Sequence, residues 1–166
     1  MQEIFNLRRL KLNKKFQSIV CDEGDELFPN GIFEFNITKI IAFIQNNNDK
    51  FQPEEVLVKS IRNRFVTGLN EKTIKNANIL TPIILAEISP GLFNVIDGHH
   101  RLERACREGV IKILAYKLLA EQHIMFMTST KAYKEYIQYW NNKIKDRMQD
   151  LKFNKQDINA NQKAHS

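Results

Sequence analysis

The sequence TPIILAEISPGLFNVIDGHHRLERACREGVIKILAYKL, residues 81–118, decides the fold of this 166-residue chain. Two apolar runs at 81–88 and 92–97 are joined by Ser-Pro-Gly, a strong turn signal, and predict two strands connected as a hairpin. A third apolar run, from 110 to 119, predicts another strand. We therefore expect these three strands to form a sheet, with one helix in the sequence between the second strand and the third.

The second strand ends at Asp97-Gly98, and the helix that follows is expected to run from His99 to about Arg107. Gly98 permits a sharp bend between strand and helix, or a close approach of the backbone to a ligand. Gly109 is a natural end for the helix, because glycine readily takes the left-handed conformation found there. The first helical turn therefore carries two histidines and an arginine.

The rest of the chain predicts two longer helices, one short helix and one more strand. Asn36 is expected to cap a helix whose apolar residues follow the helical period, and Ser129 to cap a long helix. A strand is predicted over 54–61 and a short helix over 70–79. The long helix has an apolar stripe, which we interpret as core packing rather than base stacking: Tyr133, Tyr136, Ile137, Trp140 and Ile144. This order of elements predicts a small α+β domain.

The segment before the first helix is rich in acids. Four acids within 22–26 precede a turn signal at Pro29-Asn30-Gly31. Clustered acids can bind a metal, but their spacing does not match a calcium loop. We therefore interpret the segment as a solvated acidic loop.

The formal charge of +6 is concentrated at the two ends of the chain. Residues 1–15 carry a net charge of +4 and residues 141–166 a net charge of +3, whereas residues 16–140 sum to −1. A DNA-binding face is usually a basic stripe on the folded body. We interpret these ends as solubilising tails with a weak attraction to polyanions, which leaves nucleic acid as an alternative partner.

Composition and cysteine use favour a cytoplasmic chain. Hydrophobic residues make up 43% of the sequence and charged residues 27%, which is typical of globular proteins. Cys21 and Cys106 provide neither a disulfide framework nor a zinc motif. No apolar run reaches roughly 18 residues and the first 15 residues do not resemble a secretory signal, so we expect no membrane partner. The sequence indicates no particular oligomeric state.

The turn from Asp97 to Arg101 is the candidate site for chemistry. Free backbone N–H groups and the positive end of the helix dipole favour an anion at this position. Arg101 offers a planar fork for phosphate oxygens, and His99 and His100 can donate to phosphate or exchange protons near neutral pH. Asp97 can hold a phosphate-bound metal, act as a general base or cap the helix. The alternative is a purely structural turn, because Asp-Gly is a common turn pair.

This pattern resembles the core of the ParB/sulfiredoxin superfamily, in particular its ParB-like N-terminal domain. The resemblance covers residues 53–119 and rests on Pro82-Ile83-Ile84, Asn94-Val95-Ile96, Gly98 to Arg101, Ala105 and Gly109. The upstream VLVKSIRNR resembles the family's first strand and the basic loop after it. The resemblance implies a small mixed sheet with flanking helices. The N-terminal 50 residues and the long C-terminal helix lie outside it, and we expect an N-terminal extension with one helix at 1–52 and a domain that includes the C-terminal helix at 53–150. We expect residues 151–166 to form a disordered basic tail.

Members of this superfamily are similar in using the turn to cradle nucleotide phosphates, but their chemistry differs. Sulfiredoxin has a catalytic cysteine directly after the glycine, where this sequence has His99, and Cys106 lies on another part of the helix. Chromosome-partitioning ParB proteins carry Gly-Glu-Arg-Arg-x-Arg and bind CTP. In this sequence His99 occupies the position of the Glu, His100 that of the first Arg, and Glu103 that of the last Arg. The Asp-Gly-His sequence at 97–99 is nearer to ParB-like free-serine kinases, whose Asp-Gly turn lies among the phosphates of an adenine nucleotide.

Three functions remain open at this point. The first is Mg²⁺-dependent phosphate chemistry, as in a kinase, nucleotide hydrolase or nuclease, with Asp97 and His99 as catalytic residues and Asp97 as the Mg²⁺ ligand. The phosphates of ATP, ADP or CTP would then be held by Gly98, His99, His100, Arg101, Arg62 and Arg64. Glu54 and Glu55 are the candidates for a second acid. The second function is a ParB-like nucleotide- or DNA-binding module of a bacterial or plasmid system without turnover, and the third is a partner-binding domain with a vestigial turn.

Overall fold

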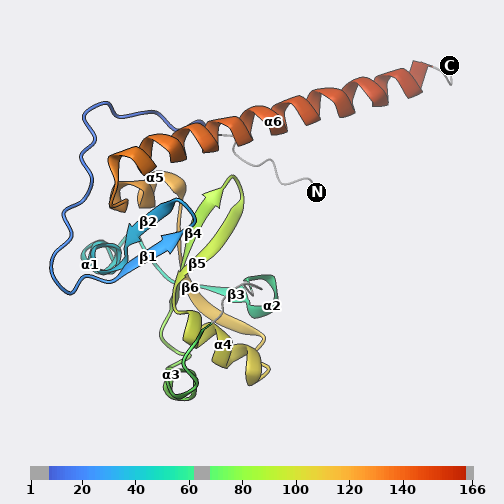
Figure 1. Cartoon of the computed structure of the whole chain (residues 1–166). Coiled ribbons are helices and arrows are strands. Elements are labelled where there is room, and N and C mark those ends of the chain that lie inside the picture. The colour runs from blue at the N-terminus through green and yellow to red at the C-terminus, as the bar shows by residue number, and fades with distance from the viewer. Residues whose placement is uncertain (1–7, 62–67, 164–166) are drawn as a thin grey trace.

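The chain folds as an α+β protein around a four-stranded mixed sheet, which confirms the predicted fold class (Figure 1). The structure is a computed structural model that describes residues 8–61 and 68–163, with side chains up to residue 152. The strands, in the order β3-β6-β4-β5 across the sheet, are β3 (Glu54–Leu57), β6 (Lys112–Leu118), β4 (Ile83–Ser89) and β5 (Leu92–Asp97). β4 pairs antiparallel with β5 and parallel with β6, and β3 pairs antiparallel with β6.

Alternate residues of β4 supply two hydrophobic cores, one on each face of the sheet. Ile83 and Leu85 belong to the core under α4 (His99–Arg107), whereas Ile84 and Ala86 belong to a larger core on the opposite face. Side chains of a strand alternate between faces, so a slip of one residue would exchange the two sets. The register of β4 is therefore specified by both cores, and it sets the position of the turn after β5.

The larger core is closed by helices and by a separate two-stranded hairpin. Its elements are β1 (Leu27–Asn30), β2 (Phe33–Asn36), α1 (Ile37–Asn46), α5 (Ala120–His123), the short 3-10 helix η1 (Ile124–Phe126) and α6 (Thr130–Lys163). The five stripe residues of α6 are all buried, with Trp140 only 1% exposed. The interpretation of this stripe as core packing is thereby confirmed.

Several predicted helix boundaries are confirmed by their capping contacts. The Asn36 side chain accepts a hydrogen bond from the Lys39 N–H at 3.0 Å, at the start of α1. Asn70 caps α3 (Glu71–Asn76) in the same way, and the Ser129 hydroxyl accepts from the N–H of Ala132 at the start of α6. These contacts satisfy backbone donors that the first helical turn leaves without partners.

Two segments differ from the predicted structure. The strand expected over 54–61 ends at Leu57, and α2 (Val58–Ile61) follows it. Extended pairing stops there because the Ser60 hydroxyl bonds back to the carbonyl of Leu57, which favours a turn. The expected acidic loop contains β1, and Pro29-Asn30-Gly31 lies at the bend of the hairpin, with Gly31 at φ +65°. The four acids within 22–26 are typical of an exposed loop, and for this reason the sequence did not predict the strand that follows them.

The α6 helix also runs further than the predicted start of the disordered tail. Its backbone is helical to Lys163, past residue 151, where the tail was expected to begin. No glycine or proline follows Gly109 in the sequence, so nothing in the local chemistry ends the helix. In Figure 1 the far end of α6 extends beyond the rest of the fold.

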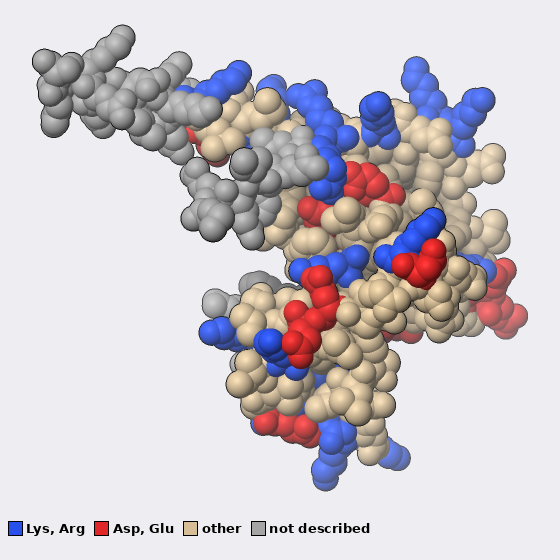
Figure 2. Space-filling model, turned by 180° about the vertical axis from the view of Figure 1, so that it is seen from behind, with Lys and Arg blue, Asp and Glu red and all other residues tan. Residues whose placement is uncertain are grey.

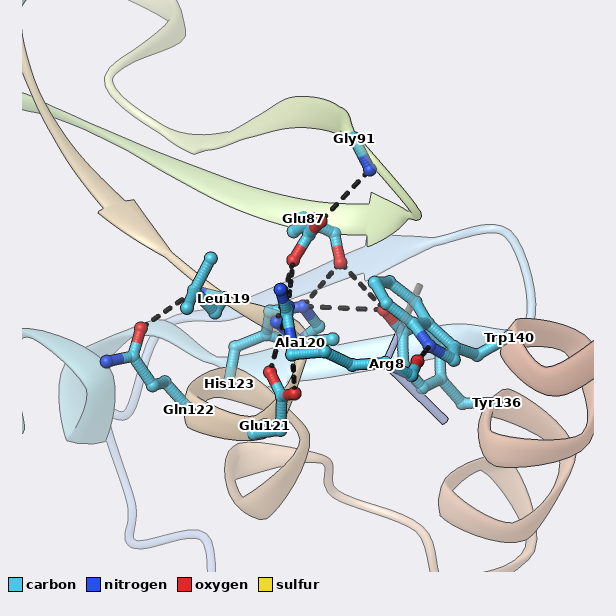
Figure 3. A network of polar contacts seen from close by, with 10 residues as sticks. All are labelled: Arg8, Glu87, Gly91, Leu119, Ala120, Glu121, Gln122, His123, Tyr136 and Trp140. Atoms are coloured by element: carbon cyan, nitrogen blue, oxygen red, sulfur yellow. Dashed lines mark hydrogen bonds and ion pairs between the residues drawn. The ribbon is translucent and has the colours of Figure 1, made fainter. Parts of the chain in front are cut away.

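A buried carboxylate on β4 ties the N-terminal segment to the domain (Figure 3). The Glu87 side chain is 7% exposed and accepts from the Arg8 guanidinium at 3.0 Å. It also accepts from the backbone N–H groups of Gly91 at 3.0 Å and Ala120 at 3.4 Å. Arg8 donates in turn to Glu121 at 2.6 Å. A charge this deeply buried is stable only when such partners surround it.

We expect Glu87→Gln to lower the free energy of unfolding by about 2 kcal/mol, because an amide nitrogen would face the donors of Arg8 and Ala120. Glu121→Gln is the matched control. Its side chain is 43% exposed and, within the described part of the chain, Arg8 is the one side chain paired with it, so the loss should stay below about 1 kcal/mol. Urea denaturation of both variants measures the difference, and equal losses would contradict the role of Glu87.

Candidate functional site

The Asp-Gly turn brings the end of β5 onto the start of α4 through an unusual glycine. Gly98 is the N-cap of α4 and has φ +94°, a conformation that residues with a side chain rarely adopt. A Cβ atom at this position would lie 2.5 Å from Cγ2 of Ile83 on the neighbouring strand. Since glycine offers no side-chain cap, the first backbone N–H groups of α4 depend on solvent or a ligand.

The aspartate and arginine of the turn bind each other. A terminal nitrogen of Arg101 donates to Oδ2 of Asp97 at 2.8 Å, and the two side chains are 21% and 19% exposed. The guanidinium packs over Gly98, 2.8 Å from where a Cβ would stand. Its Nε is buried and has no hydrogen-bond partner among the described residues. Arg101 thus neutralises Asp97 at the base of the turn.

The turn forms one wall of a cleft of about 580 Å³. The opposite wall is the β1–β2 hairpin, which lies against β5 in the fold (Figure 1). The lining residues are Glu26, Phe28, Pro29, Asn30, Gly31, Leu69, Asn94, Val95, Ile96, Asp97, Gly98, His99 and His100. Of the five predicted turn residues, four therefore line the cleft, whereas Arg101 does not and instead pairs with Asp97.

The two adjacent histidines contact different elements. The His99 ring stacks on Phe28 of β1, with ring centroids 5.1 Å apart and an angle of 28° between the planes. Burial lowers the pKa of His99 below its usual value, although the charge of Asp97 acts in the opposite direction. The His100 Nε2 accepts a hydrogen bond from the Asn70 N–H at 3.3 Å. His99 is accordingly a neutral ring at neutral pH, in which one nitrogen donates a hydrogen bond and the other accepts one.

The two candidates for a second acid do not lie at the turn. Glu54 and Glu55 form exposed ion pairs with Lys117 and Lys112 on β6, and two strands separate β3 from β5. Arg62 and Arg64 lie outside the described residues. Among the residues that the structure does describe, no group of three or more His, Cys, Asp or Glu could hold a metal ion.

The β1–β2 hairpin, which forms the wall of the cleft opposite the turn, was not predicted from the sequence. Phe28 and Asn30 lie about seventy positions before the turn. The signal available was Pro29-Asn30-Gly31 between the apolar pairs of Leu27-Phe28 and Phe33-Phe35, a pattern typical of a hairpin. Which edge of the sheet this hairpin would contact depends on the tertiary fold, and no local pattern carries that information.

Comparison with known proteins leaves the family of this chain open, since neither a protein-family model nor a curated protein matches the sequence. In the part of the chain covered by the structure, no helix is long and apolar enough to cross a membrane. The fold and the cleft define an α+β domain with a ligand-sized depression beside a helix N-terminus. The resemblance to the ParB/sulfiredoxin superfamily stays a prediction.

Proposed function

We propose that the cleft binds a nucleotide, with its phosphates against the start of α4. The observation that carries this proposal is the position of the uncapped helix N-terminus at Gly98, His99 and His100, which lies in the cleft wall. Backbone N–H groups and the helix dipole favour a phosphate there. The proposal agrees with what the resemblance to ParB-like domains implies for this turn.

The hairpin wall suits the nucleoside part of such a ligand. Phe28 and Pro29 offer apolar contact, and a purine or pyrimidine ring is planar and binds well to such surfaces. The side-chain amides of Asn30 and Asn94 line the same cleft and have no hydrogen-bond partner among the described residues. Amides can donate and accept, so they are able to contact the edge of a base or a ribose hydroxyl.

The geometry favours binding over turnover. A phosphoryl-transfer site needs a base or a metal beside the phosphates, and Asp97 is already paired with Arg101. Glu54 and Glu55 lie across the sheet. The carboxylates available to a Mg²⁺ in the cleft are Asp97, which is already paired, and Glu26 beside the hairpin. The described residues contain no group of three or more His, Cys, Asp or Glu that could hold a metal ion. We therefore propose a nucleotide-binding module, with kinase, hydrolase or nuclease activity as the second candidate.

We expect at least one of ATP, ADP, AMP, CTP and GTP to raise the melting temperature, and Arg101→Ala to weaken that nucleotide's affinity about tenfold. Without Arg101 the charge of Asp97 is uncompensated and repels the phosphates. By the same argument Asp97→Asn should keep or increase the affinity, whereas a metal-binding or catalytic Asp97 predicts a loss. Thermal-shift and calorimetric titrations, with and without Mg²⁺, measure both variants.

Arg107→Ala is the matched control for Arg101→Ala. Arg107 lies at the far end of α4, where it pairs with Glu71 and Glu103, and its loss should change the nucleotide affinity less than twofold. Circular dichroism checks that each variant is folded. If no nucleotide shifts the melting temperature of the unmodified protein, the proposal is wrong.

A further inference from the structure

The described part of the basic N-terminal end lies beside the long helix α6. The N-terminal segment 8–16 runs along α6 and is held there by polar contacts. The backbone N–H and C=O of Leu10 both bond to the Asn141 amide at 2.9 Å, and the N–H of Asn13 donates to the Tyr133 hydroxyl at 3.1 Å. The Phe16 ring stacks on Tyr133 with centroids 3.7 Å apart. Segment 8–16 is therefore part of the folded body.

Four lysines of α6 lie on one side of the helix, apart from its acids, whereas Lys143 and Arg147 fall on the far side of those acids. With 100° per residue, Lys131, Lys134, Lys145 and Lys152 fall within one quarter of the circumference, beside Asn141. We call these four residues the lysine stripe. The acids of the same part of the helix, Glu135, Asp146 and Asp150, fall on the next quarter. The lysine stripe is exposed and spans about 32 Å of helix.

Segment 8–16 extends the lysine stripe with further cations. Its contact with Asn141 places it directly beside the stripe, and Arg9, Lys11, Lys14 and Lys15 are all exposed. Within the described residues, none of these four forms an ion pair, and neither do Lys134, Lys145 and Lys152. Figure 2 shows basic side chains gathered along the upper edge of the molecule, where α6 lies. Segment 8–16 and the lysine stripe thus form one positive surface on the folded body.

We propose that this surface, the lysine stripe together with segment 8–16, binds the phosphate backbone of double-stranded nucleic acid. A row of exposed cations along a helix, of which Lys131 alone pairs with an acid among the described residues, complements the regular row of phosphates on a duplex. This binding would be independent of base sequence, because phosphate contacts carry no sequence information directly. The surface is on α6, and the inference does not depend on the nucleotide proposed for the cleft.

The side chains of the surface favour a duplex over a single strand or a lipid bilayer. Single-strand binding usually uses exposed aromatic rings as stacking platforms, and here Phe16 is covered by Tyr133, which is itself 3% exposed. A membrane-surface helix pairs its basic residues with a broad exposed apolar face. The apolar face of α6 is buried in the core from Tyr133 to Ile144.

The test is fluorescence anisotropy of a labelled 20-base-pair DNA duplex of arbitrary sequence, titrated with the full chain at several salt concentrations. We expect binding that weakens steeply with salt. The double variant Lys134→Glu and Lys145→Glu should lower the affinity at least tenfold and reduce the slope of log K against log salt by about 2, one unit for each lost phosphate contact. Lys11→Glu with Lys14→Glu should have a similar effect if segment 8–16 is part of the same surface.

The control is Lys72→Glu with Lys75→Glu, two exposed lysines on α3, away from α6. This variant changes the net charge by the same amount and should stay within about threefold of the unmodified protein. Equal losses in both double variants would mean general charge attraction and would overturn the proposal. So would tighter binding to a single-stranded oligothymidine, or stripe-dependent binding to phosphatidylserine vesicles but not to DNA.

Discussion

Gly98→Ala is expected to lower the free energy of unfolding by about 3 kcal/mol. A positive φ, as in the left-handed conformation, costs a residue with a side chain roughly 1–2 kcal/mol of stability. The new Cβ would also stand 2.5 Å from Cγ2 of Ile83, the fully buried first residue of β4, and overpacking of this kind costs about 1–3 kcal/mol. For a chain of this size the melting temperature should fall by roughly 10 °C, as measured by circular dichroism.

Gly31→Ala separates the two causes of that loss. Gly31 also has positive φ, at +65°, but no atom lies within 4 Å of the position that its Cβ would take. Only the cost of the positive φ applies at this position, so we expect Gly31→Ala to lower the free energy of unfolding by about 1 kcal/mol. Equal losses at both glycines would show that Ile83 moves aside freely. The close packing at Gly98 would then have no role in shaping the turn.

The strands and helix around this turn were predictable because their signals are local. The Ser-Pro-Gly turn, the alternation of β4 and the glycine after α4 each lie within a few residues of the structure that they specify. The caps at Asn36, Asn70 and Ser129 are local in the same sense, and the helices begin there. Hairpin β1–β2 was missed because its four preceding acids outweighed its short apolar pairs.

The candidate site was predicted in part, and the missing part is non-local. Sequence reasoning identified the turn, but it did not place Arg101 on Asp97, although their i, i+4 spacing permits that pair. It also treated the basic ends as tails, since the charge distribution along a chain does not show where the ends fold. The contact of Leu10 with Asn141 joins positions 131 residues apart and could not be read from either segment alone.

The free energy of unfolding should fall by about 3 kcal/mol as the pH drops from about 6.5 to about 4, because of His123. Its ring is fully buried, and burial lowers the pKa of His123 to about 4. Its Nε2 lies 2.8 Å from the Glu87 carbonyl, and its buried Nδ1 has no partner among the residues that the structure describes, so a second proton would find no acceptor there (Figure 3). An unfolded histidine takes up that proton near pH 6.5, and each unit of difference is worth about 1.4 kcal/mol.

This pH dependence tests whether His123 and its contact with Glu87 stay buried in the folded protein. Between pH 6.5 and 4 the unfolded chain holds more protons than the folded one, so acid favours unfolding. His123→Gln keeps a donor for the Glu87 carbonyl but cannot titrate. It should therefore flatten the slope of stability against pH in urea denaturation from pH 7.5 to 4.5. His100→Gln, at the cleft, is the matched control and should keep the slope of the unmodified protein. A slope unchanged by His123→Gln would mean that the ring is reached by water in the native state, and that the contacts around Glu87 open without unfolding.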